Sequence, residues 1–259
     1  MKLYIKEDIK NIREIKPVIH HITNFVAMND CANITLALGA LPVMAHALEE
    51  VEEMTCLSQV LNLNIGTLTD EWVKAMIKAG KKANELNIPV VFDPVGAGAT
   101  RFRTQCAVDM LNEVNISIVK GNGAEIASLY GVKSEVKGVE AGKIEADMND
   151  VVKNFAKKIK SVVVATGKDD YISDGKRTCM FEGKGSGMLS TITGSGCMLG
   201  SVISAFSCVQ KDHFLASIEG LLFFEKASEY ASKKSQLPAS FKVALLDEIY
   251  RMNGTETEE

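Results

Sequence analysis

The chain has 259 residues, of which 46% are hydrophobic and 24% are charged; this balance excludes intrinsic disorder and is typical of a globular protein. Its formal net charge is −4 at pH 7, and no block of about five basic residues occurs, so we expect neither nucleic acid nor an anionic membrane as a partner. No apolar run approaches the roughly 18 residues of a transmembrane helix, and Glu7 and Asp8 lie where a signal peptide needs an apolar core, so we expect a cytoplasmic protein.

Short apolar runs alternate with helical patterns over most of the chain. The continuous runs PVVF and SVVVA are typical of strands that are buried on both faces of a sheet. The alternation predicts an α/β fold with a mainly parallel sheet. The predicted strands are 17–23, 41–45, 59–65, 89–92, 116–120 and 161–165, and the helical patterns between them are 26–38, 47–58, 69–86, 104–113, 122–131 and 149–160.

The last third of the chain has a different pattern. Residues 171–182 predict a β-hairpin that turns at Asp174 and Gly175. Three helical patterns follow, at 194–210, 213–234 and 238–252, and a frayed polar tail is expected at 254–259. Because no linker or internal repeat interrupts the sequence, we expect one domain over residues 1–259.

Three consecutive predicted strands end in a glycine next to a polar side chain. They are followed by DPVGAG at 93–98, by KGNGAE at 120–125 and by Thr166-Gly167. Ligands of open α/β sheets bind beyond the carboxyl ends of the strands, so these segments are candidates for a binding site. Asp93 and Glu125 are the carboxylates placed to hold a hard cation such as Mg²⁺. The alternative is that they are a helix N-cap and a surface helix residue.

A second signal is the segment ITGSGCMLG at 192–200, which opens an apolar helix. Glycines before a helix let backbone N–H groups surround an anion, and the helix dipole favours negative charge there. The alternative is a flexible entry to a core helix.

The P-loop and G-x-G-x-x-G motifs are absent, which disfavours those nucleotide-binding classes. His20 and His21 point to opposite faces of a strand, so at most one of them faces the ligand side of the sheet. The six cysteines form no C-x-x-C pair, which disfavours a zinc knuckle or a redox motif. In a reducing compartment we expect them to be free thiols, five of them in the core.

Taken together, these segments resemble the hydroxyethylthiazole kinase family. The resemblance begins with HHITNFV at 20–26, GALPVMAH at 39–46 and EEVEEM at 49–54, and continues in order through DPVGAG, KGNGAE and GSGCML at 194–199. The PVMAH and G-x-G-C stretches are specific to that family. The DPVGAG and G-N-x-x-E stretches are shared more widely among ribokinase-like vitamin kinases. The resemblance covers about residues 15–250.

This resemblance implies a ribokinase-like fold, with a mainly parallel central sheet flanked by helices on both faces. It implies transfer of the γ-phosphoryl group of ATP to the hydroxyl of 4-methyl-5-(2-hydroxyethyl)thiazole, in thiamine salvage. It also implies a homotrimer with active sites at subunit interfaces. Asn24 and Met44 of one subunit would then line the thiazole pocket, and Gly194 of its neighbour would contact the substrate.

Further roles follow from the same resemblance. ATP would contact Lys120, Asn122, Thr166 and Gly167, and Mg²⁺ would be organised by Asp93 and Glu125, the latter through water. The N–H groups of Gly194, Ser195, Gly196 and Cys197 would surround the transferring phosphoryl group.

Two positions invite comparison with related kinases. Many ribokinase-like kinases carry Asp as the base where this chain has Cys197, whereas the thiazole kinases resemble it in having Cys. A helix N-terminus lowers a thiol pKa, so we expect a minority of thiolate, a weak base and slow turnover. Lys120 stands where the family more often has Arg, which predicts a lower nucleotide affinity because lysine lacks the bidentate fork.

Two alternatives remain at this stage. Kinases for hydroxymethylpyrimidine or pyridoxal share the D-P-V and G-N-x-x-E stretches, but they usually carry Asp in place of Cys197 and lack PVMAH. A non-catalytic relative that binds thiamine precursors would explain the weak base and Lys120. Such a protein would have no need of Asp93.

Overall fold

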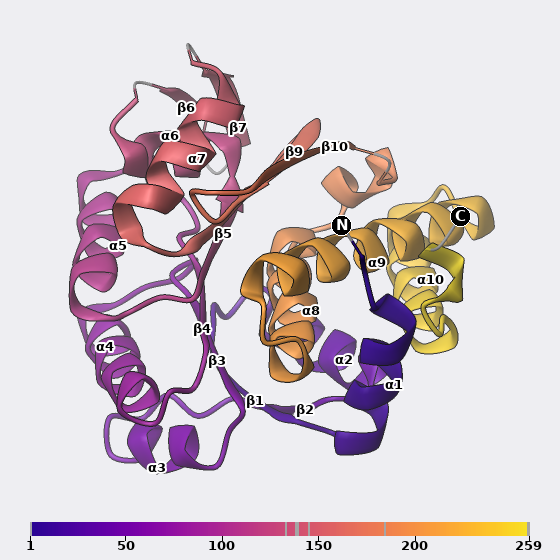
Figure 1. Cartoon of the computed structure of the whole chain (residues 1–259), viewed down its shortest axis with the longest axis horizontal. Helices are drawn as coiled ribbons and strands as arrows, with labels where there is room; N and C mark the ends of the chain where they lie inside the picture. The colour runs from indigo at the N-terminus through magenta and orange to yellow at the C-terminus, as the bar shows by residue number, and fades with distance from the viewer. Residues whose placement is uncertain (1, 133, 138–139, 145, 184, 258–259) are drawn as a thin grey trace.

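A mixed eight-stranded sheet forms the centre of the computed structural model, which describes residues 2–132, 134–137, 140–144, 146–183 and 185–257 (Figure 1). The strand order is β10-β9-β8-β5-β4-β3-β1-β2. All neighbours from β8 to β2 pair in parallel, and β9 and β10 extend one side as an antiparallel hairpin. The strands are β1 (Val18–Ile22), β2 (Leu41–Val43), β3 (Val60–Asn64), β4 (Val90–Asp93), β5 (Ile118–Asn122), β8 (Val162–Thr166), β9 (Asp169–Ser173) and β10 (Thr178–Glu182).

Helices cover both faces of this sheet, so the α/β and ribokinase-like predictions are confirmed in architecture. One face carries α1 (Ile5–Ile15), α2 (Met28–Leu38), α8 (Ser195–Val209), α9 (His213–Lys234) and α10 (Pro238–Arg251). The other face carries α3 (Val51–Cys56), α4 (Asp70–Glu85), α5 (Arg101–Glu113), α6 (Gly123–Tyr130) and α7 (Met148–Ile159). Figure 1 shows the two helical layers on opposite sides of the strands.

A hydrophobic core lies on each face of the sheet, and the apolar strands contribute residues to both. Val91 and Ile118 belong to the core under α8 and α9, whereas Phe92 and Val119 belong to the core under α4 to α7. Successive side chains of a strand point to opposite faces, so a run without polar residues suits a strand covered on both sides. The two histidines of β1 follow the same rule, since His20 contacts Thr55 of α3 and His21 contacts Thr35 of α2.

Some elements were not predicted. Helix α1 presents Ile5, Ile9 and Ile12 to the core at helical spacing. A second hairpin is formed by β6 (Ser134–Lys137) and β7 (Glu140–Ile144), and a short 3-10 helix by Gly187–Thr191. Helix α5 begins three residues before the predicted pattern because the Thr100 side chain accepts a hydrogen bond from the Arg103 N–H and caps it.

The end of the chain packs further than the sequence predicted. Met252 and Gly254 are buried, and Thr255–Thr257 forms a 3-10 turn; residues 258 and 259 lie outside the described part. The six cysteines are free thiols, and Cys56 is exposed, so the core position expected for it is wrong. The single domain over 1–259 stays a prediction. Among the described residues, no helix is both long and apolar enough to cross a membrane.

Candidate active site

The carboxyl ends of β3, β4 and β5 meet the first turn of α8. Asn64 ends β3 and lies in register with Asp93, which ends β4. Lys120 lies in β5, and Asn122 at the end of that strand is in register with Thr166 of β8. The parallel sheet therefore gathers at one edge the polar residues that the sequence places after separate strands, as expected for this class of fold.

Lys120 and Asp93 form a buried ion pair at this edge. The Lys120 Nζ lies 3.0 Å from Asp93 Oδ2, and each side chain is only 4% exposed. The same Nζ donates to the Gly196 carbonyl oxygen at 2.9 Å. Burial disfavours the ammonium, but the nearby negative groups, Asp93 first, outweigh it and raise the pKa of Lys120. A permanent cation is thus held between β4, β5 and the start of α8.

Burial also acts on Asp93. It raises the pKa of this carboxyl group, and Lys120 counteracts part of the increase. Oδ2 bonds to the ammonium, whereas Oδ1 is buried with no hydrogen-bond partner among the described residues. The helix after β4 is capped by Thr100. The reading of Asp93 as an ordinary N-cap is therefore wrong.

Glu125 is buried at the start of α6, and so is not the surface residue of the alternative interpretation. Its two carboxylate oxygens accept hydrogen bonds from the backbone N–H groups of Gly96 and Asn122, each at 2.7 Å. The Asn122 side chain accepts in return from the Glu125 N–H, which completes a capping box. Burial and then Asp93 raise the pKa of Glu125 to about 7, against the effect of these two N–H donors. Glu125 therefore fastens the turn after β4 to the turn after β5.

The carboxylates fit a magnesium–nucleotide better than a metal bound by protein alone. The described residues contain no group of three or more His, Cys, Asp or Glu side chains that could hold a metal ion. They do contain Asp93 Oδ1, a buried oxygen with an open coordination position. Mg²⁺ commonly takes one or two carboxylates and completes its shell with phosphate oxygens and water. The donor set fits that pattern.

The turn before α8 is built to approach a ligand with its backbone. Gly194 is the N-cap with φ +84°, a conformation that favours glycine. A Cβ atom there would also lie 3.0 Å from the Cβ of Ala27. The first N–H groups of a helix have no partner within the helix. Those of Ser195, Gly196 and Cys197 are of this kind, which makes the turn suited to a phosphoryl group.

Cys197 lies in that first turn, and its sulfur faces two amide groups. Sγ is 3.3 Å from Asn24 Nδ2 and 3.3 Å from Asn64 Nδ2. Burial, and next the charge of Asp93, raise the pKa of the Cys197 thiol, although Lys120 and both amides oppose this. The pKa of Cys197 is thus raised, and not lowered as predicted from the helix N-terminus, because burial and the charge of Asp93 outweigh Lys120 and the two amides.

The substrate-binding residues implied by the resemblance lie at the same edge. Asn24 follows β1 and Met44 follows the neighbouring β2. The structure already brings Asn24 next to Cys197, and Ala27 next to Gly194, within one chain. The contribution of Gly194 from a neighbouring subunit, which the resemblance implies, stays a prediction.

Two features of the edge were missed from the sequence. Asn64 has no local signature other than its place at the end of a strand. The rings of Phe25, His46 and Trp72 form an aromatic cluster, with ring centroids 4.8 Å apart for Phe25 and Trp72 and 4.3 Å apart for His46 and Trp72. Phe25 adjoins Asn24, and His46 is two residues from Met44, so the cluster flanks the residues expected to bind substrate.

The predicted nucleotide contacts lie at the ends of β5 and β8. Thr166 donates to the Gly121 carbonyl oxygen at 3.3 Å, and the Gly167 N–H donates to Asp170 Oδ1 at 3.0 Å. Asn122 pairs with Thr166 across the sheet. The structure thus brings these residues together beside Lys120.

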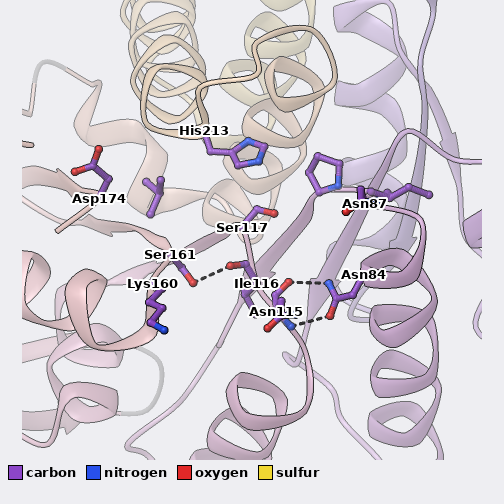
Figure 2. Close-up of a pocket in the computed structure, with 12 residues that line it drawn as sticks. Asn84, Asn87, Asn115, Ile116, Ser117, Lys160, Ser161, Asp174 and His213 are labelled. Carbon is purple, nitrogen blue, oxygen red and sulfur yellow. Dashed lines mark hydrogen bonds between the residues drawn. The ribbon is translucent and has the colours of Figure 1, made fainter. Parts of the chain in front are cut away.

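A cavity of about 450 Å³ opens at the opposite, amino-terminal edge of the sheet (Figure 2). It contains none of the predicted site residues. The Asn84 side chain donates to the Asn115 carbonyl at 2.9 Å and accepts from the Asn115 N–H at 2.8 Å, whereas His213 Nδ1 is buried with no hydrogen-bond partner among the described residues. His213 and Lys160 also line it. Volume alone therefore does not mark the candidate active site.

Comparison with family models matches residues 9–255 to the hydroxyethylthiazole kinase family. Similar curated proteins carry the name hydroxyethylthiazole kinase. One from Thermoanaerobacter pseudethanolicus is 52% identical, covering 95% of this chain and 94% of that protein. One from Methanosarcina mazei is 49% identical, covering 98% and 97%.

Solved structures agree with this relationship. The hydroxyethylthiazole kinase protein from Pyrococcus horikoshii superposes with a TM-score of 0.89 at 41% identity, covering 98% of this chain and 95% of that chain. The ADP complex of Bacillus subtilis pyridoxal kinase superposes with a TM-score of 0.60 at 14% identity, covering 82% and 91%. This second likeness shows the fold alone.

Proposed function

The chain belongs to the hydroxyethylthiazole kinase family, and we propose that it transfers the γ-phosphoryl group of ATP to the hydroxyl of 4-methyl-5-(2-hydroxyethyl)thiazole, in thiamine salvage. The observation that carries the proposal is the buried Lys120–Asp93 pair set against the turn before α8. A cation with an adjacent backbone anion site meets the main demand of phosphoryl transfer, which is positioning and charge stabilisation.

The nucleotide lies along the ends of β5 and β8 in this proposal. Lys120 contacts phosphate oxygens, Asn122 and Thr166 flank them, and the backbone of Gly167 lies against the nucleotide. Support comes from the shared edge of these residues. Lysine provides one compact charge where arginine would provide a fork, so weaker ATP binding is expected than in an arginine-bearing relative.

Asp93 and Glu125 would hold Mg²⁺, Asp93 through its open Oδ1 and Glu125 through water. When bound, the cation neutralises charge on the nucleotide phosphates. The N–H groups at 194–197 surround the γ-phosphoryl group, and Lys120 stays between that group and Asp93. The open buried oxygen of Asp93 supports this assignment.

The thiazole lies between Asn24 and Met44, with its hydroxyl against Cys197. Met44 offers a polarizable wall for a sulfur heterocycle, and the Asn24 amide oxygen can accept a hydrogen bond from the hydroxyl. Cys197 assists deprotonation of that hydroxyl. Its raised pKa leaves little thiolate at neutral pH, so slow turnover is expected.

The protein is further proposed to be a cytoplasmic homotrimer with active sites close to the subunit interfaces. Phe25 and Val26 directly follow Asn24 and have 62% and 61% of their surface exposed. Large apolar side chains beside a substrate pocket are suited to burial by a second chain. Light scattering coupled to gel filtration tests the stoichiometry.

An ADP-release assay with Mg-ATP tests the activity, with hydroxyethylthiazole, hydroxymethylpyrimidine and pyridoxal as acceptors. Turnover on the thiazole is expected. Turnover only on the pyrimidine or the pyridine would contradict the substrate while keeping the phosphate site. Thiazole binding without any turnover would favour a non-catalytic sensor.

Cys197→Ala tests the proposed base. We expect kcat to fall about tenfold to a hundredfold, at or below the low end of what a general base contributes, with KM for ATP little changed. Full retention of kcat would exclude a catalytic role for the thiol.

A further inference from the structure

The amide of Asn64 has only one possible orientation. Its Oδ1 accepts the Gly66 backbone N–H at 2.9 Å and Asn24 Nδ2 at 2.8 Å. A backbone N–H can only donate, so the oxygen must face it. The NH₂ end of Asn64 therefore faces the Cys197 sulfur, 3.3 Å away.

Asn24 is fixed by the same logic. Its Oδ1 accepts the Ala27 N–H at 2.9 Å, which turns its NH₂ end toward Asn64 and Cys197. A Cβ atom at Gly66 would lie 2.8 Å from the Asn24 side chain. The glycine thus leaves room for this amide, and two backbone N–H groups orient both donors on the sulfur.

We propose that Asn64 is a positioning residue for phosphoryl transfer, because it holds the Cys197 sulfur against the substrate hydroxyl through an amide whose orientation the backbone of Gly66 fixes. The inference rests on the proposed function of this site. The oxygen of the Asn64 amide is engaged by Gly66 and Asn24 and its NH₂ end faces the sulfur, so it acts through the sulfur and not by contact with the substrate.

The chemistry explains why two donors are useful. A thiolate sulfur has three lone pairs; two accept the amide hydrogens, and one stays directed at the substrate. As the hydroxyl oxygen bonds to the γ-phosphorus, its O–H bond breaks and an S–H bond forms. The bond from γ-phosphorus to the bridging oxygen breaks at the same time and ADP leaves. The thiol later returns its proton to solvent.

Asn62 provides a matched control. It lies two residues earlier on the same strand and is also buried, but its amide donates to the Ser204 hydroxyl at 2.7 Å. Residues i and i+2 of a strand share one face. Asn62→Ala therefore removes a similar buried hydrogen bond under the same helix without touching the sulfur.

A double-mutant cycle tests the proposal. Asn64→Ala is expected to lower kcat about tenfold, the effect of losing roughly 1.4 kcal/mol of transition-state stabilisation, with both KM values within about twofold. In the Cys197→Ala background the same change is expected to alter kcat less than about twofold. Asn62→Ala is expected to leave kcat unchanged while lowering stability.

The cycle also separates Cys197 from Asp93, which ends the neighbouring strand in register with Asn64 and whose pKa Asn64 lowers. An effect transmitted through Asp93 would persist at full size without the sulfur, and that result would overturn the proposal. An Asn64→Ala variant with unchanged kcat would overturn it as well. Asn64→Ser, which keeps a smaller donor, replaces Asn64→Ala if thermal melting shows that the alanine variant is unfolded.

Alkylation provides a readout that does not need the kinase activity. Iodoacetamide reacts with thiolate, and its attachment to Cys197 is located by fragmenting the tryptic peptide of residues 185–211, with Cys197→Ala as the blank. Asn64→Ala is expected to slow this alkylation at least about threefold, whereas Asn62→Ala does not. An unchanged rate would overturn the placement of Asn64 even if the thiazole proved not to be the substrate.

Discussion

The two edges of the central sheet are built by the same strands, β4, β5 and β8, but they handle polar groups differently. At the carboxyl edge, Asp93, Lys120 and Glu125 are buried, and one oxygen of Asp93 has no hydrogen-bond partner among the described residues. At the amino edge, Asn84 and Asn115 pair with each other at the surface around the cavity of Figure 2. Hydrogen bonds thus connect neighbouring segments at both edges, but among these residues only those of the carboxyl edge are buried and charged.

This difference indicates how to recognise a site on such a sheet. A buried charge is costly unless it is paired, so a buried charged pair at a strand end is a candidate functional feature. The amino edge has the more obvious cavity, yet its Asn84 and Asn115 groups are already satisfied. The carboxyl edge holds a cation, an open carboxylate oxygen and a backbone anion site within one cluster. This combination of buried charge and an open carboxylate oxygen marks the site better than volume does.

Removal of the buried cation should have the largest effect. Lys120→Met leaves Asp93 without its partner and the phosphates without their cation, so we expect kcat/KM to fall at least about a hundredfold and stability to fall by about 3–5 kcal/mol. ADP release and urea unfolding measure both. The matched control at the amino edge is Lys160→Met, an exposed lining residue of the cavity, for which we expect less than about 0.5 kcal/mol and no loss of activity. Comparable losses of activity and stability in both variants would show that the two edges do not differ in this way.

Glu125→Gln should change how stability depends on pH. The pKa of Glu125 is raised to about 7 in the folded protein, above its ordinary value of 4.5. Between these values the folded state binds more protons than the unfolded state, so the free energy of unfolding falls as pH rises through this window. The change amounts to at most about 3 kcal/mol.

Urea midpoints from pH 4.5 to 8, without Mg²⁺, measure this slope. The glutamine variant is less stable throughout, because its NH₂ cannot accept from a backbone N–H, but its curve should be flatter. A wild-type slope that survives in Glu125→Gln would show that another group titrates.

The hydrogen bonds between Asn84 and Asn115 at the amino edge should contribute to stability and not to activity. Asn84→Ala removes two exposed hydrogen bonds to the Asn115 backbone, so we expect a loss of about 1 kcal/mol in unfolding free energy. Because these bonds lie at the far edge of the sheet, kcat and both KM values should stay at wild-type levels. A change in kcat would mean that the two edges are coupled.

The smallest expected effect is a change in the fluorescence emission of Trp72. Trp72 is the single tryptophan of the chain, and it stacks with His46 beside the predicted thiazole pocket. Saturating hydroxyethylthiazole should change its emission by a measurable fraction, and ATP alone should change it less. An unresponsive Trp72 at saturating thiazole would place the acceptor away from Asn24 and Met44.

Local sequence signals were sufficient for most of the fold. The run SVVVA predicted a strand at 161–165 and the structure has β8 at Val162–Thr166, since a run of β-branched residues without polar interruption suits a buried strand. Pro238 likewise begins α10 as predicted. Helix α1 lies outside the helices predicted from the sequence, although its buried isoleucines have helical spacing.

The candidate site was predictable in its residue types but not in its electrostatics. Asp93, Lys120 and Cys197 each stand in a recognisable segment. The pKa of Cys197 was predicted in the wrong direction, because it is raised by burial and next by the charge of Asp93 on β4, and both act only once α8 has packed on the sheet. Asn64 was missed for the same reason, since its partners Gly66, Asn24 and Cys197 come from three different segments.

The sequence by itself determined the alternation of strands and helices, the family and the set of chemically capable residues, because periodicity, turn residues and motifs are properties of short segments. Tertiary structure alone decided which of those residues are buried together, which oxygen of Asp93 stays open and which end of each asparagine faces the sulfur. These outcomes depend on burial and on hydrogen bonds between distant segments, and both exist only once the sheet and α8 have packed.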